Sequence, residues 1–141
     1  METKHICIMS TDDNPMGLKE VAEILQKGGT VGIPTETVYG LAANAYDPDA
    51  VARIFAAKGR PQDNPLIVHI ADINELPKIA AEIPETAKKL AAAFWPGPLT
   101  MVLKRTERIP AIISAGVFAF LCSSRYACCS FDAVVSSAGK S

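Results

Sequence analysis

A lysine and an arginine, Lys58 and Arg60, stand on either side of a glycine. Arginine offers a bidentate fork and lysine a compact positive charge. Two such groups beside a polyphosphate can neutralise the charge that develops as a phosphoryl group is transferred. A simpler interpretation is that cations near a helix end complement the helix dipole and bind no ligand. Their spacing alone leaves both interpretations open.

Polar groups also stand at two predicted strands. Thr35 and Thr37 flank Glu36 after a buried strand, and two hydroxyls there could hold a carboxylate, although hydroxyls at such positions also cap turns. His69 interrupts an otherwise apolar strand, so its ring nitrogens need partners. A backbone partner and a ligand contact are both open for this histidine.

The elements that must position these residues can be read from the pattern of apolar residues. Asp47 followed by Pro48 predicts a helix start, and Lys58 followed by Gly59 predicts its end. Asp72 and a glutamate three residues later resemble a capping box that opens another helix. The predicted strands are residues 4–9, 30–33, 66–70 and 99–103. The predicted helices are residues 16–26, 48–58, 72 onward and 84–94. Strands alternating with helices predict an α/β fold.

The bulk properties of the chain exclude several classes of protein. With 141 residues, 49% of them hydrophobic, the chain suits one globular domain. With a net charge of −1, the chain has no overall electrostatic field that would indicate a nucleic-acid or membrane partner. No apolar run approaches the roughly 20 residues that span a bilayer, so we expect a cytoplasmic protein. The four cysteines follow neither the spacing of a zinc site nor that of a secreted disulfide framework, so we expect reduced thiols. Walker, zinc-protease and nucleophile-elbow motifs are absent from the sequence.

Three phrases, in order, carry a resemblance to a known family: GGTVGIPTETVYGLAANAYD, IFAAKGRPQDNPLIVHIAD and FWPGPLTMVLK. Together they closely resemble the YrdC-like family of threonylcarbamoyl-AMP synthases. The resemblance implies a twisted mixed sheet flanked by helices, with an open, positively lined cavity. It also implies an enzyme that makes threonylcarbamoyl-AMP from L-threonine, bicarbonate and ATP, releases pyrophosphate, and supplies a tRNA modification.

The resemblance assigns roles to five residues and implies one metal ion. Lys58 and Arg60 match the family's basic pair and would hold the ATP phosphates. Thr35 and His69 match residues of the threonine pocket, and Ser114 stands where relatives carry a threonine near the nucleotide. Mg²⁺ would bridge phosphate oxygens, so that positioning and electrostatics would dominate the transfer.

The resemblance weakens after Gly116. There, relatives continue with a VAVR-like strand and a PSAN-like segment, which this sequence lacks. The tail holds three of the four cysteines and no proline. We therefore expect residues 1–116 to be the N-terminal part of a YrdC-like domain and residues 117–141 to be an atypical tail, truncated or frameshifted relative to the family. The incomplete signature means that this chain could be inactive.

Two other functions remain open on sequence grounds. One is a carbamoyl-transfer enzyme of the hydrogenase-maturation type, which contains a similar domain and uses carbamoyl phosphate. The other is a non-catalytic RNA-binding module, because cavities in the family are basic. The near-neutral charge of this chain gives the RNA-binding alternative little support.

Overall fold

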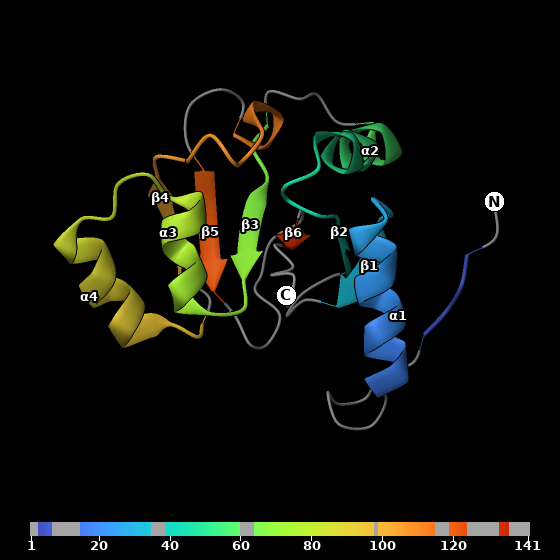
Figure 1. The fold of residues 1–141 in the computed structure, drawn as a ribbon, viewed down its shortest axis with the longest axis horizontal. Helices are drawn as coiled ribbons and strands as arrows, with labels where there is room; N and C mark the ends of the chain where they lie inside the picture. The colour runs from blue at the N-terminus through green and yellow to red at the C-terminus, as the bar shows by residue number, and fades with distance from the viewer. Residues whose placement is uncertain are drawn as a thin grey trace.

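The chain forms an α/β fold, as its sequence predicts (Figure 1). A computed structural model describes residues 3–6, 15–34, 39–59, 64–97, 99–114, 119–123 and 133–135. In chain order the elements are α1 (Pro15–Gln26), β1 (Val31–Pro34), β2 (Tyr39–Ala42), α2 (Pro48–Lys58), β3 (Ile67–Ile70), the 3₁₀ helix η1 (Ile73–Glu75), α3 (Leu76–Ile79), α4 (Glu85–Phe94), β4 (Thr100–Leu103), the 3₁₀ helix η2 (Ala111–Ile113), β5 (Ala119–Ser123) and β6 (Ala133–Val135). Within the described ranges, no helix has the length and apolar character needed to cross a membrane.

The described strands form two sheets. The larger one has the strand order β4-β5-β3-β6, in which β3 runs parallel to β5 and β6 while β4 runs antiparallel to β5. β1 and β2 form a separate antiparallel pair. Because β2 contacts β6, this pair adjoins the larger sheet at its β6 edge (Figure 1). The mixed sheet that the family resemblance implies is therefore present.

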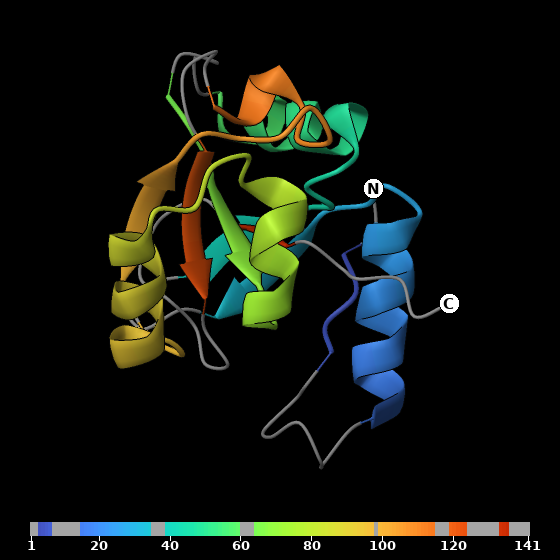
Figure 2. The same cartoon turned by 60° about the vertical axis from the view of Figure 1, so that its left-hand side comes forward.

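The two faces of β3 have different environments. Val68 and Ile70 are buried, whereas Ile67 and His69 are half-buried. Side chains alternate between the faces of a strand, so His69 points away from the face that carries Val68. The Val68 face packs in one core with residues of α3 and α4, among them Leu76 and Ala91. Figures 1 and 2 show α3 lying against this sheet.

The capping box predicted at Asp72 is only half correct. Asp72 does cap a helix, because its Oδ1 accepts the amide of Asn74 at 2.7 Å. The helix begins as the single 3₁₀ turn of η1 before continuing as α3. The buried carboxylate of Glu75 accepts the amide of Ala71 at 3.4 Å, one residue before the position that a capping box requires.

The described part of the strand predicted at residues 4–9, which is residues 4–6, is not a strand. Three strands among the described residues have no counterpart in the sequence prediction. β2 begins at Tyr39, in the segment PTETVYG that follows the strand predicted at residues 30–33. β5 and β6 lie beyond Gly116, where neither helical nor strand periodicity is clear. β5 is paired on both sides, and strands in such positions are often continuous apolar runs without alternation. Its sequence, AFLCS, fits that description.

Candidate functional site

Lys58 is the last residue of α2, and two caps fix where that helix begins and ends. Oδ1 of Asp47 accepts the amides of Asp49 at 2.9 Å and Ala50 at 3.2 Å. At the other end Gly59 adopts the left-handed conformation with φ of 59°, which an L side chain rarely adopts. Both predicted helix boundaries are thus confirmed. Lys58 is exposed at this end of the helix, and Arg60 lies outside the described residues.

Ser114 lies at a junction between the sheet and η2. The amide of Leu66, just before β3, donates to the carbonyl of Ile113 at 2.9 Å, and α2 contacts η2. Ser114 follows directly and is only 3% exposed. Its hydroxyl donates to the carbonyl of Ala111 at 3.3 Å, within its own turn. A contact from this hydroxyl to a nucleotide would therefore require it to leave Ala111.

His69 lies in the interior of the sheet. It is the third residue of β3, between Cys122 of β5 and Val135 of β6 in the strand register. Its ring is half-buried and its Nε2 atom is shielded from solvent. The histidine predicted from the sequence as the polar member of a central strand therefore occupies that place, on the face away from α3. Thr35 lies outside the described residues, immediately after the end of β1.

The structure brings the elements of three candidate residues together. Lys58 ends α2, Ser114 ends η2, and these helices meet near the start of β3. His69 lies three residues after Leu66, which is about 10 Å along an extended strand. The contacts thus place α2, η2 and the start of β3 in one region of the fold.

Arg108 is a cation that sequence reasoning did not single out. Its guanidinium carbon lies 5.5 Å from the centroid of the Tyr46 ring, just before the N-cap of α2. Because Arg108 belongs to no sequence motif, its contact with Tyr46 is seen only in the structure. This cation–π contact joins the loop before η2 to the start of α2, at the opposite end of the helix from Lys58.

Metal ligands are not gathered in the part of the chain that the structure describes. Among those residues, no group of three or more His, Cys, Asp or Glu side chains could hold a metal ion. What the described residues offer is a lysine at a helix end, a buried serine and a half-buried histidine. Such groups can bind and orient an anion, which suits transfer between substrates held in place.

Comparison with known proteins identifies relatives over most of the chain. The model of the Sua5/YciO/YrdC family, described as "Telomere recombination", matches residues 23–124. The threonylcarbamoyl-AMP synthase of Pyrococcus abyssi is 55% identical over 100 residues, covering 71% of this chain and 29% of the relative. The enzyme of the same name from Bacillus subtilis is 46% identical over 121 residues, covering 83% of this chain and 35% of the relative.

A solved structure shares the fold. Its title is "Crystal structure of P. abyssi Sua5 complexed with L-threonine", and it superposes with a TM-score of 0.76 at 49% identity, over 79% of this chain and 33% of that chain. This chain thus spans about a third of the length of these relatives.

Proposed function

The chain belongs to the Sua5/YciO/YrdC family, and from this premise we propose that its function is that of an L-threonylcarbamoyladenylate synthase. The observation that carries the proposal is the 55% identity to a relative named threonylcarbamoyl-AMP synthase. A homologous structure in complex with L-threonine supports threonine as a substrate. ATP follows from the AMP part of the product.

The proposed reaction requires no protein nucleophile. The amino nitrogen of L-threonine forms a bond to the carbon of bicarbonate with loss of water, giving an N-carboxylate. A carboxylate oxygen then attacks the α-phosphorus of ATP, and the bond to the bridging oxygen breaks to release pyrophosphate. Charge on the phosphates must be neutralised while this occurs, so positioning and electrostatics supply the catalysis.

The proposed residue roles follow the chemistry of each side chain. Lys58 and Arg60 bind the ATP phosphates, and the exposed position of Lys58 at the end of α2 leaves it accessible to such an anion. Ser114 lies near the nucleotide, and Thr35 and His69 contact threonine. His69 is suited to this role because it faces away from the side of the sheet that α3 covers.

Mg²⁺ is proposed to arrive with ATP. This ion usually keeps several waters and binds through substrate phosphates rather than in an all-protein cage. The described residues contain no cluster that could hold a metal. We therefore assign Mg²⁺ no protein ligand and derive no step through it.

The wider setting of the reaction is also a proposal. The product would serve threonylcarbamoylation of an adenosine beside the tRNA anticodon, in the cytoplasm. Residues 1–116 are proposed to be the N-terminal part of the domain, and residues 117–141 an atypical tail. The unusual composition of residues 117–141 and the absence of a PSAN-like phrase from the sequence support this division. We accordingly expect little pyrophosphate release from the 141-residue chain.

Binding of ATP tests the proposed site in this chain directly. Lys58→Ala should weaken ATP binding about tenfold, because a charge-assisted hydrogen bond contributes roughly 1.5–3 kcal/mol. Lys78→Ala is the matched control, since Lys78 is also exposed and also lies in the last turn of a helix. Equal losses in the two variants, measured by titration calorimetry, would remove the basis for the phosphate site.

The two alternative functions predict different ligands. A carbamoyl-transfer enzyme would use carbamoyl phosphate in place of threonine and bicarbonate. An RNA-binding module would bind tRNA with an affinity that falls steeply as salt increases. Carbamoyl phosphate turnover, or tRNA binding with no ATP binding, would favour one of these functions over the synthase.

A further inference from the structure

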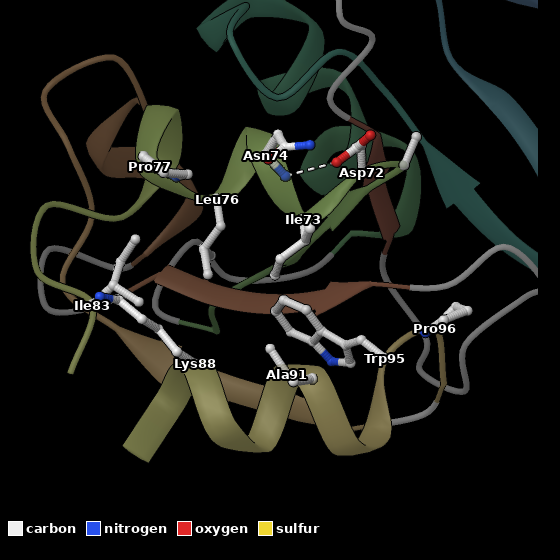
Figure 3. Close-up of a pocket in the computed structure, with 12 residues that line it drawn as sticks. Asp72, Ile73, Asn74, Leu76, Pro77, Ile83, Lys88, Ala91, Trp95 and Pro96 are labelled. Atoms are coloured by element: carbon white, nitrogen blue, oxygen red, sulfur yellow. Dashed lines mark hydrogen bonds between the residues drawn. The ribbon is translucent and has the colours of Figure 1, made fainter. Parts of the chain in front are cut away.

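A groove lies between two helical segments on the side of the sheet opposite His69. One wall is η1 and α3, and the other is α4 together with Trp95 (Figure 3). The volume of the groove is about 740 Å³. Small-molecule sites generally have volumes of about 300–1,000 Å³ and mostly apolar linings. The groove thus has the size of a ligand site and is separate from the site proposed for ATP and threonine.

Most of the groove is apolar, with one fixed aromatic ring. Ile73, which is 46% exposed, and the buried Leu76 line one wall, and Ala91 lies in the other. Figure 3 shows the side chains of Trp95 and Ile73 extending toward each other across the groove. Nε1 of Trp95 donates to the carbonyl of Leu99 at 2.7 Å, which holds the indole in place. A fixed indole beside aliphatic groups favours stacking of a flat ring system.

Among the described residues that line the groove, only Asp72 and Lys88 carry charged side chains, and these two make different contacts. Asp72 is committed to the N-cap of η1 through its bond to the amide of Asn74. Lys88 pairs with Glu85 on the same helix at 2.6 Å, and these side chains are 57% and 77% exposed. Such an exposed pair contributes only a few tenths of a kcal/mol, so the Lys88 ammonium can turn to a ligand at little cost. In Figure 3, Lys88 and Asp72 lie toward opposite ends of the groove.

We propose that this groove is a second binding site, for a small planar aromatic compound that carries one anionic group. The ring system lies between Trp95 and Ile73, and the anionic group points to Lys88, away from the carboxylate of Asp72. The volume, the fixed indole and the separation of the two charges together specify this ligand class. The site is independent of the proposed synthase function.

The single tryptophan of the chain provides a direct signal, because Trp95 lines the groove. The probe is 8-anilinonaphthalene-1-sulfonate, an anion with a planar naphthalene ring system, added to the purified 141-residue chain. Saturable binding with loss of Trp95 emission by energy transfer is expected. Absence of saturable quenching would overturn the proposal.

Two pairs of variants separate the groove from general binding to exposed apolar surface. Ala92 lines the groove, whereas its exposed neighbour Ala93 does not. Ala92→Phe should weaken binding at least tenfold, and Ala93→Phe should leave the affinity unchanged. Likewise Lys88→Ala should weaken binding about two- to fivefold, while Lys89→Ala should have no effect. Far-ultraviolet circular dichroism establishes that all four variants retain the fold.

The uncharged analogue N-phenyl-1-naphthylamine tests the role of the anionic group. Lys88→Ala should leave the affinity of this analogue unchanged, because it lacks the sulfonate. Equal effects of Lys88→Ala on both probes, or equal effects of Ala92→Phe and Ala93→Phe on either, would show that the proposed groove does not select the ligand.

Discussion

Asp47→Ala removes the side-chain cap of α2, the helix that carries Lys58. In the structure, Oδ1 of Asp47 accepts two backbone amides that no helical carbonyl can reach, at 2.9 and 3.2 Å. Loss of an N-cap costs about 1 kcal/mol, and loss of a negative charge at a helix N-terminus costs roughly 0.3–1 kcal/mol more. The expected decrease in the free energy of unfolding is therefore about 1.5 kcal/mol. For 141 residues the unfolding entropy is roughly 0.3 kcal/mol/K, so Tm should fall by about 5 °C.

Urea unfolding followed by circular dichroism measures this change, and two matched variants test its cause. Asp47→Asn keeps a good capping oxygen without the charge, so it should lose less than half as much stability as Asp47→Ala. Asp72→Ala removes the cap of a single 3₁₀ turn, in which Asp72 accepts a hydrogen bond from the amide of Asn74. This variant should therefore lower the free energy of unfolding less than Asp47→Ala does. The cap account is refuted if Asp47→Asn is as damaging as Asp47→Ala, or if Asp72→Ala costs as much.

Two further predictions concern the packing and backbone of the same region. Ile54→Ala should lower the free energy of unfolding by about 2–5 kcal/mol because Ile54 is fully buried, whereas Leu90→Ala, at an exposed helix position, should cost less than about 1 kcal/mol. Gly28→Ala should lower the free energy of unfolding more than Gly59→Ala, although both glycines have positive φ. The reason is that a Cβ at Gly28 would lie 2.8 Å from Oδ2 of Asp47, whereas a Cβ at Gly59 would meet nothing within 4 Å. Denaturant titration checks both pairs, and equal losses within either pair would contradict the packing seen here.

Helix boundaries were the most predictable part of the fold because their causes are local. Asp47 and Gly59 act through amides and backbone angles within a few residues of themselves, so their types were sufficient. His69 was also predictable in place, since a lone polar residue in a short apolar run marks a strand interior. These predictions required no knowledge of distant contacts.

The strands that escaped prediction depend on distant partners. β5 becomes a strand by pairing with β4 on one side and β3 on the other, and β2 by pairing with β1. The groove could not be predicted from the sequence either, because Ile73 and Trp95 are 22 positions apart. For the proposed synthase site, the candidate residues came from the sequence, and the structure added that α2 contacts η2 and that η2 is hydrogen-bonded to the residue before β3.

We propose that this chain contributes residues that bind ATP and threonine in a synthase. The most direct test is pyrophosphate release from ATP by a chimera that keeps residues 1–116 and takes the following segment from the Pyrococcus abyssi relative, which is 55% identical over 100 residues. We expect release that requires both L-threonine and bicarbonate and that is lost on Lys58→Ala but retained on Lys78→Ala. A folded chimera that releases no pyrophosphate in response to threonine, or whose activity survives Lys58→Ala, would contradict the account.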